Sequence, residues 1–216
     1  MAGRFITVEG GEGAGKTTQL IFMRDYLAQA GYRVVVTREP GGTTLGEEIR
    51  GLLLSHRHNG MTLIAETLLM FAARAEHLEQ VIRPALAEGH WVLCDRFTDA
   101  TYAYQGGGRG LALEWIAVLE DWVQGALRPD LTLLFDLPVT VGLARAGKRS
   151  AVDRFEREDV AFFERVRATY REQGVRHSNR YRVVNADQPV AGVWAEVQNI
   201  LDEFLRSSLD RSDILQ

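Results

Sequence analysis

The chain has 216 residues, of which 46% are hydrophobic and 25% charged, and its formal net charge is −4. This apolar content is enough for a sizeable core, and the negative charge argues against nucleic acid as a partner. The single cysteine, Cys94, excludes an internal disulfide, and no apolar run approaches the roughly 18 residues of a membrane span. With no leader pattern before the first predicted strand, we expect a cytoplasmic protein that binds no membrane.

The first predicted element is a strand over residues 5–9, which leads into a glycine-rich loop and a helix. The loop matches the pattern G-x-x-x-x-G-K-[ST] and consists of Gly10, Gly11, Glu12, Gly13, Ala14, Gly15, Lys16, Thr17 and Thr18. Glycines let backbone N–H groups surround a phosphate, and the helix directs its positive end at the same anion. In this motif the lysine reaches the β- and γ-phosphates, and the first threonine ligates Mg²⁺. The stretch therefore predicts a nucleoside triphosphate site with Mg²⁺ on Thr17.

Strands and helices alternate along the rest of the chain. Apolar runs predict strands over residues 33–37, 91–95, 131–136 and 181–184, and helical spacing predicts helices over residues 44–53, 62–87, 113–123, 139–146, 159–174 and 190–205. A shorter helix is expected to begin at residue 100 and to stop at the glycines 106–108. Continuous apolar strands between helices are typical of a parallel sheet covered on both faces. We predict an α/β fold with a doubly wound five-stranded sheet, a single domain over residues 1–208 and a loosely ordered tail over 209–216.

Polar segments follow the predicted strands at their carboxyl ends, where ligands bind in such sheets. Among them are many arginines, namely Arg38, Arg74, Arg96, Arg109, Arg145, Arg149 and Arg154. Phosphoryl transfer between two nucleotides needs such cations, because two polyanions must be brought together and the charge on the transferred group stabilised. A guanine-reading N-K-x-D segment is absent from the sequence, which argues against a hydrolytic GTPase.

Several segments are more specific than the phosphate loop. They are Arg-Glu-Pro-Gly-Gly-Thr at 38–43, Phe-Ala-Ala-Arg-Ala at 71–75, Asp-Arg-Phe at 95–97, Tyr-Gln-Gly-Gly-Gly-Arg at 104–109 and Asp-Arg-Phe-Glu at 153–156. With the loop that contains Glu12, they resemble bacterial thymidylate kinases nearly from end to end of the chain. The resemblance implies a P-loop kinase fold with a short lid over residues 147–154. It also implies Mg²⁺-dependent transfer of a phosphoryl group from ATP to dTMP, giving ADP and dTDP for dTTP biosynthesis.

The resemblance further implies roles for individual residues. The dTMP site would comprise Glu12 on the sugar 3′-hydroxyl, Arg38 and Arg96 on the phosphate, Phe71 stacked on thymine, Arg74 on a thymine carbonyl, and Thr101 and Gln105 along the base pocket. The catalytic set would be Lys16, Asp95, Arg96 and Arg149. Asp95 would orient either the water shell of the metal or the phosphate-binding arginine.

The phosphate loop itself contains no arginine. This absence resembles the bacterial subtype whose lid supplies the catalytic cation. We predict that Arg149 is this cation, with Lys148 and Arg154 as the alternatives.

The resemblance implies a homodimer that packs through helices. The helical regions 62–87 and 113–123 have enough apolar positions for this role, including Trp115 and Trp122, although these tryptophans fit a core equally well.

Two other functions fit the same motifs. One is a kinase for another nucleoside monophosphate on the same fold, which a substrate panel distinguishes. The other is a non-catalytic nucleotide-binding module, which would bind ATP without dTMP-dependent ADP release.

Overall fold

The computed structural model describes residues 3–55, 60–147, 154–155 and 158–213, and for 208–213 it describes the backbone alone. Its strands are β1 (Phe5–Glu9), β2 (Val34–Arg38), β3 (Trp91–Asp95), β4 (Leu131–Asp136) and β5 (Tyr181–Asn185). They form one sheet in the order β2-β3-β1-β4-β5, and every neighbouring pair is parallel. The predicted five-stranded parallel sheet is therefore confirmed.

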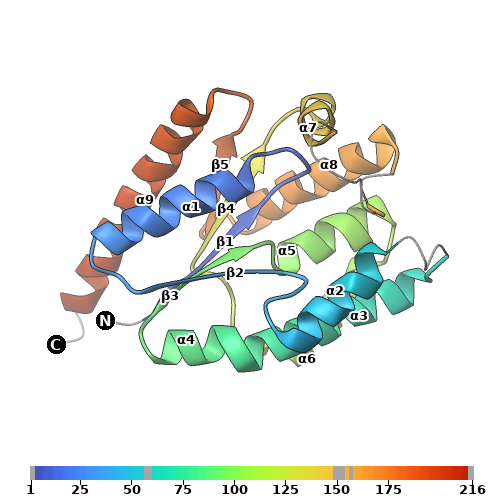
Figure 1. Ribbon diagram of the computed structural model, residues 1–216, viewed down its shortest axis with the longest axis horizontal. Helices are drawn as coiled ribbons and strands as arrows, with labels where there is room; N and C mark the ends of the chain where they lie inside the picture. The colour runs from blue at the N-terminus through green and yellow to red at the C-terminus, as the bar shows by residue number, and fades with distance from the viewer. Residues whose placement is uncertain (1–2, 56–59, 148–153, 156–157, 214–216) are drawn as a thin grey trace.

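Helices cover both faces of this sheet (Figure 1). The α-helices are α1 (Lys16–Gln29), α2 (Thr44–Leu54), α3 (Leu63–His77), α4 (Arg83–Ala87), α5 (Thr98–Thr101), α6 (Leu113–Gln124), α7 (Val139–Ala146), α8 (Val160–Arg176) and α9 (Val190–Asp213). Two π-helical segments, η2 (Leu78–Ile82) and η3 (Tyr102–Gly108), continue α3 and α5. In the described part of the chain, none of these helices combines the length and the apolar character that a bilayer span requires.

The central strands place successive apolar side chains on opposite faces. Leu93 and Leu133 pack with residues of α1 and α9, whereas Val92 packs with η2 on the other side. Because both faces are buried, β1, β3 and β4 consist of continuous apolar runs.

The structure differs from the sequence-based prediction at several places. The helical region predicted over 62–87 consists of α3, η2 and α4 in succession, and the helix expected from residue 100 begins at Thr98. β2 is an edge strand, and Val36 is 45% exposed there, because only one neighbour covers it. The glycines 106–108 do not stop the helix but lie within η3, where a Cβ on Gly107 or Gly108 would overlap a side chain of α8. α9 continues to Asp213, beyond the boundary expected at residue 205, since no glycine or proline interrupts the chain there.

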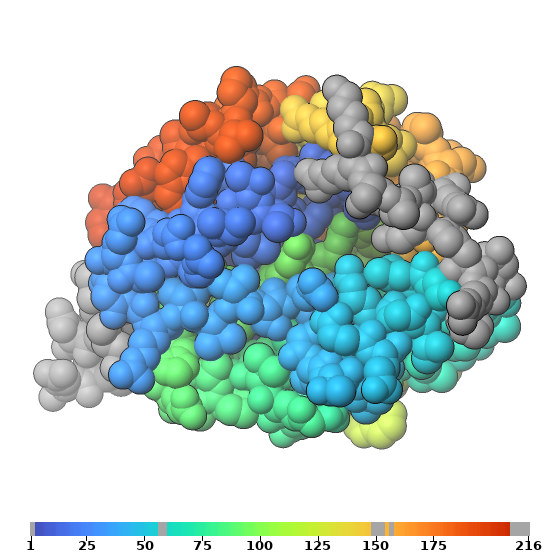
Figure 2. Space-filling view, in the orientation of Figure 1, coloured from blue at the N-terminus to red at the C-terminus, as the bar shows by residue number. Residues whose placement is uncertain are grey.

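The sheet register brings the carboxyl ends of three strands together. Asp95 on β3 is paired with Val8 on β1 and with Arg38 on β2. The phosphate loop, the segment 38–43 and the segment 95–109 therefore leave the sheet at one edge. In the space-filling view, green atoms lie recessed between the blue N-terminal segment and cyan α2 (Figure 2).

Candidate active site

The phosphate loop is closely packed against the strands and helices that surround it. Gly10, Gly13 and Gly15 have φ angles of 137°, 68° and 83°. A Cβ on Gly10 would lie 2.5 Å from the carbonyl oxygen of Phe135, and one on Gly13 would overlap the carbonyl oxygen of Gly142. Glycine is therefore required by conformation and by space at positions 10 and 13, and by conformation at position 15.

Lys16 lies inside the curve of this loop. Its Nζ donates hydrogen bonds of 3.0 Å to the carbonyl oxygens of Gly10 and Gly11, and the residue is buried. Burial lowers the pKa of the Lys16 ammonium, and nearby Arg96 lowers it further. An anion in the loop would offset both effects, which fits the predicted phosphate-binding role.

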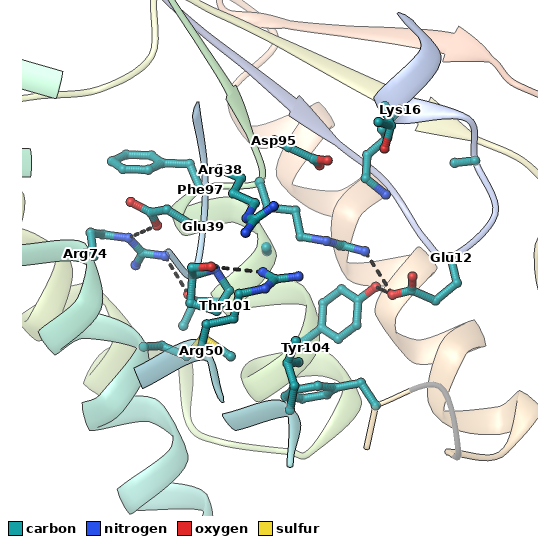
Figure 3. Close-up of a pocket in the computed structure, with 18 of the residues that line it drawn as sticks. Glu12, Lys16, Arg38, Glu39, Arg50, Arg74, Asp95, Phe97, Thr101 and Tyr104 are labelled. Carbon is teal, nitrogen blue, oxygen red and sulfur yellow. Dashed lines mark hydrogen bonds and ion pairs between the residues drawn. The ribbon is translucent and has the colours of Figure 1, made fainter. Parts of the chain in front are cut away.

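A cavity of about 270 Å³ opens beside the loop. Residues 12–17 of the loop line one end of it. Elsewhere the lining includes four arginines, namely Arg38, Arg50, Arg74 and Arg96 (Figure 3). The site therefore joins a triphosphate cradle to a second region of positive charge.

Arg96 lies between these two regions. Its guanidinium donates to the Gly10 carbonyl at 3.0 Å, to the Tyr170 hydroxyl at 3.2 Å and to Glu12 Oε1 at 2.9 Å. Its backbone has a φ of 67°, an uncommon value for a residue other than glycine. Such a conformation at the end of a strand turns the side chain back toward the phosphate loop.

Glu12 faces the cavity from within the loop. Besides Arg96, the Tyr104 hydroxyl donates to its Oε1 at 2.7 Å. The carboxylate is thus held by two donors, one from the residue that follows β3 and one from η3 (Figure 3).

Arg74 is the deepest of the lining arginines, with 2% of its surface exposed. Its Nε donates to Glu39 Oε2 at 2.7 Å and its NH2 to Thr101 Oγ1 at 3.0 Å. The guanidinium carbon lies 4.7 Å from the centre of the Phe71 ring and 5.1 Å from that of Phe97.

This arrangement gives no support to the prediction that Phe71 stacks on a base. Phe71 is buried and does not line the cavity, because Arg74, one helical turn further along α3, lies over its ring. The apolar side chains that do line the cavity include Leu54, Met70, Phe97 and Phe155. In this structure Arg74 lies over the Phe71 ring, and a contact of Phe71 with a base stays a prediction.

Glu9, the last residue of β1, is a buried carboxyl group behind the site. Its Oε1 accepts from the backbone N–H of Phe97 at 2.7 Å, and its Oε2 is hydrogen-bonded to Tyr170 at 2.9 Å. Burial, reinforced by Asp99, raises the pKa of Glu9 to about 8.

The structure separates the predicted arginines into two groups. Arg38, Arg74 and Arg96 line the cavity, as do Thr101 and Gln105. Three others bond elsewhere: Arg109 binds Glu66 and Glu158, Arg145 binds the Ala186 carbonyl, and Arg154 binds Glu66. Lys148 and Arg149 lie outside the described residues.

The residues present fit a magnesium ion that arrives with its nucleotide. In the described ranges no group of three or more His, Cys, Asp or Glu side chains could hold a metal by itself. Thr17 and Asp95 both line the cavity. The buried Asp95 Oδ1 has no hydrogen-bond partner among the residues that the structure describes. Mg²⁺ characteristically uses one or two protein oxygens together with waters and substrate phosphates.

The sequence analysis missed several lining residues, among them Arg50 and Tyr104. Arg50 lies on α2 and donates to the Pro40 carbonyl at 2.9 Å, two turns after the loop 38–43. An arginine two helical turns after a loop at the carboxyl end of a strand could have been predicted to line the site. Tyr104 and Phe97 lie in segments that the sequence analysis had already singled out, but their aromatic character alone did not separate a lining position from a core position.

Comparisons with known proteins agree with this geometry. Residues 8–197 match the family model for thymidylate kinase. The chain is 58% identical to a thymidylate kinase of Pseudomonas entomophila, over 98% of this chain and 99% of the relative. It is 56% identical to that of Teredinibacter turnerae, over 95% of this chain and 100% of the relative. The crystal structure of thymidylate kinase from Ehrlichia chaffeensis superimposes with a TM-score of 0.77 at 34% identity, covering 94% of this chain and 99% of that one.

Proposed function

The chain belongs to the thymidylate kinase family, and we infer that it transfers the γ-phosphoryl group of ATP to dTMP, giving ADP and dTDP. One observation carries this inference: a single cavity joins the glycine-rich loop to Arg38, Arg50, Arg74 and Arg96. A site for one nucleotide would need only the loop, whereas two polyanions that meet need cations at both ends.

On the acceptor side, Arg96 and Arg38 would bind the dTMP phosphate. A phosphate monoester is largely doubly ionised near pH 7, so its oxygen attacks the γ-phosphorus without a general base on the protein. The bond to the ADP oxygen breaks as the new bond forms. Glu12 would accept from the sugar 3′-hydroxyl, and Arg74, Thr101 and Gln105 would contact the base. These assignments are supported by the position of each side chain on the cavity wall.

On the donor side, residues 10–18 would cradle the ATP phosphates, and Lys16 would exchange its loop carbonyls for β- and γ-phosphate oxygens. Thr17 would ligate Mg²⁺ directly, and Asp95 would hold water of its coordination shell. When bound, the metal neutralises charge on the β- and γ-phosphates. Arg96, near both the loop and the acceptor, would stabilise the charge of the transferred group.

A lid over residues 147–154 would complete the site in the manner of the subtype that lacks an arginine in the phosphate loop. Arg154, at its described end, is engaged by Glu66 at 2.6 Å and by the Leu53 carbonyl, which favours Arg149 over Arg154 as the cation for the γ-phosphate. Closure would exclude water and disfavour ATP hydrolysis.

We further propose a homodimer through α2, α3 and α6. These helices expose large apolar side chains, namely Leu45, Leu52, Ile64, Leu68, Trp115, Val118 and Trp122. α3 packs against both α2 and α6, so the exposed residues belong to adjoining helices. Trp122 is 82% exposed, which is an unusual position for tryptophan on a monomer.

An ADP-release assay tests the proposal. The purified chain with ATP and Mg²⁺ is given dTMP, dUMP, AMP, CMP or GMP in turn. The proposal predicts the highest kcat/KM with dTMP. Preference for another monophosphate would assign a different kinase, and ATP binding without any acceptor-dependent ADP release would indicate a non-catalytic module.

A further inference from the structure

The two side chains proposed to read the base, Arg74 and Gln105, are each held by a buried carboxylate. Glu39 binds Arg74, and Glu66 binds Gln105. Both carboxylates are nearly fully buried, at 5% and 1% exposed. Glu66 therefore acts on Gln105 from behind the cavity wall, whereas Glu39 is part of the wall beside Arg74.

Glu39 restricts how Arg74 can donate. Oε2 of Glu39 accepts from Arg74 Nε, and Oε1 is bonded to His77 Nδ1 at 3.0 Å, so the carboxylate is itself held from two sides. The NH2 group of Arg74 donates a hydrogen bond to the hydroxyl of Thr101. Within the described residues, the buried NH1 group has no acceptor. A guanidinium can only donate, and a buried donor without an acceptor is unfavourable, so we expect a ligand oxygen to accept from this NH1 group.

Glu66 determines which end of the Gln105 amide faces the cavity. Gln105 Nε2 donates to Glu66 Oε1 at 2.8 Å. Arg109 and Arg154 also donate to Glu66, so the carboxylate is flanked by two guanidinium groups and can only accept. The opposite amide orientation would set two acceptors against each other. Gln105 lines the cavity, so its carbonyl oxygen, the end of the amide that does not bind Glu66, is the group left to accept from a ligand.

We propose that Glu39 and Glu66 are positioning residues that set the hydrogen-bond polarity of the base site, with Arg74 as a donor beside Gln105 as an acceptor. Gln105 lies one helical turn after Thr101, which binds Arg74, so the two readers are neighbours. The pair complements a pyrimidine that has a carbonyl next to a ring N–H, as in thymine. Cytosine has an amino group next to an unprotonated ring nitrogen. Its amino group, a donor, would face the donor Arg74, and its ring nitrogen, an acceptor, would face the carbonyl of Gln105. This inference rests on the proposed function.

The test is a double-mutant cycle on selectivity. The Kd of dTMP is measured by calorimetry and that of dCMP by displacement, for the wild type, Glu66→Gln, Gln105→Met and the double variant. A glutamine at position 66 can donate as well as accept, so Gln105 loses its fixed orientation. We expect Glu66→Gln to lower the preference for dTMP about 10- to 100-fold, and the double variant to lose no more than Gln105→Met alone.

The matched control is Glu158→Gln. Glu158 binds Arg109 at 3.0 Å, as Glu66 does, but it makes no contact with Gln105, so we expect the dTMP preference to change less than about twofold. If Glu66→Gln does not fold, Glu39→Gln combined with Arg74→Met provides the same cycle on the other reader.

An unchanged preference in folded Glu66→Gln, or a loss that adds in full to that of Gln105→Met, would overturn the proposal. Binding is measured without turnover, so these outcomes are separate from a failure of the proposed function, which would appear as wild-type protein without dTMP-dependent ADP release.

Discussion

Replacing Gly42 by alanine should distort the loop that carries the acceptor-side residues. Gly42 has a φ of 81°, and a Cβ would lie 2.6 Å from the ring of His77 and 2.7 Å from Thr37 Oγ1. The ring cannot move aside freely, because it is fully buried and bonded to Thr37 and Glu39. The positive φ costs about 1–2 kcal/mol and the overpacking about 1–3 kcal/mol, so we expect Gly42→Ala to lower the free energy of unfolding by roughly 2–5 kcal/mol.

Gly31→Ala is the matched control. Gly31 has a φ of 91°, and a Cβ at this position would meet no atom within 4 Å, so the substitution carries the conformational cost without the overlap. Urea unfolding of both variants isolates the packing contribution as their difference, expected at about 1–3 kcal/mol. Gly42→Ala should also raise the KM for dTMP more than that for ATP. Equal destabilisation at the two sites would refute the reasoning that His77 anchors this loop.

Three further predictions address the buried acid, the lid and the dimer. Glu9 has a folded-state pKa of about 8 against a reference value of 4.5, so the folded protein holds an extra proton between these values and its stability falls with rising pH by at most about 1.4 kcal/mol per unit. Glu9→Gln should flatten that slope in urea titrations from pH 5 to 8, and an unchanged slope would contradict the shift. Arg149→Ala should lower kcat by about 100-fold or more while changing the KM for ATP far less, and Lys148→Ala should have the smaller effect on kcat; an unaltered kcat in Arg149→Ala would refute the lid assignment. Trp122→Glu should convert a dimer into a monomer in sedimentation equilibrium, and a wild-type monomer at micromolar concentration would exclude the dimer.

Much of the fold could be predicted because the local patterns are strong. The strands over 5–9, 91–95 and 131–136 and the helix over 139–146 have the predicted bounds. The strand order could not be predicted, since a valine run such as 34–36 does not show whether one strand or two will cover it. The π-helical segment η3 was missed because it packs closely against α8, which is distant in the chain, as the position of Gly108 beside Phe162 illustrates.

The candidate site was predicted in its charged groups and less well in its apolar ones. Arg38, Arg74 and Arg96 line the cavity as expected, because a residue at the carboxyl end of a parallel strand, or on a helix beside that end, lies where ligands bind in such sheets. Phe71 was expected on the cavity wall but lies beneath Arg74, since a buried position and a cavity wall are equally apolar in sequence. The carboxylates Glu39 and Glu66 gave no signal, because their partners lie on elements distant in the chain.

The most direct measurement follows the γ-phosphate of ATP. The chain is incubated with ATP labelled at the γ-phosphoryl group, Mg²⁺ and dTMP, and the products are separated. The account predicts that the label appears in dTDP, in a one-to-one ratio with ADP, and that omitting dTMP leaves it in ATP. Release of the label as inorganic phosphate, or its transfer to another monophosphate in preference to dTMP, would contradict the account.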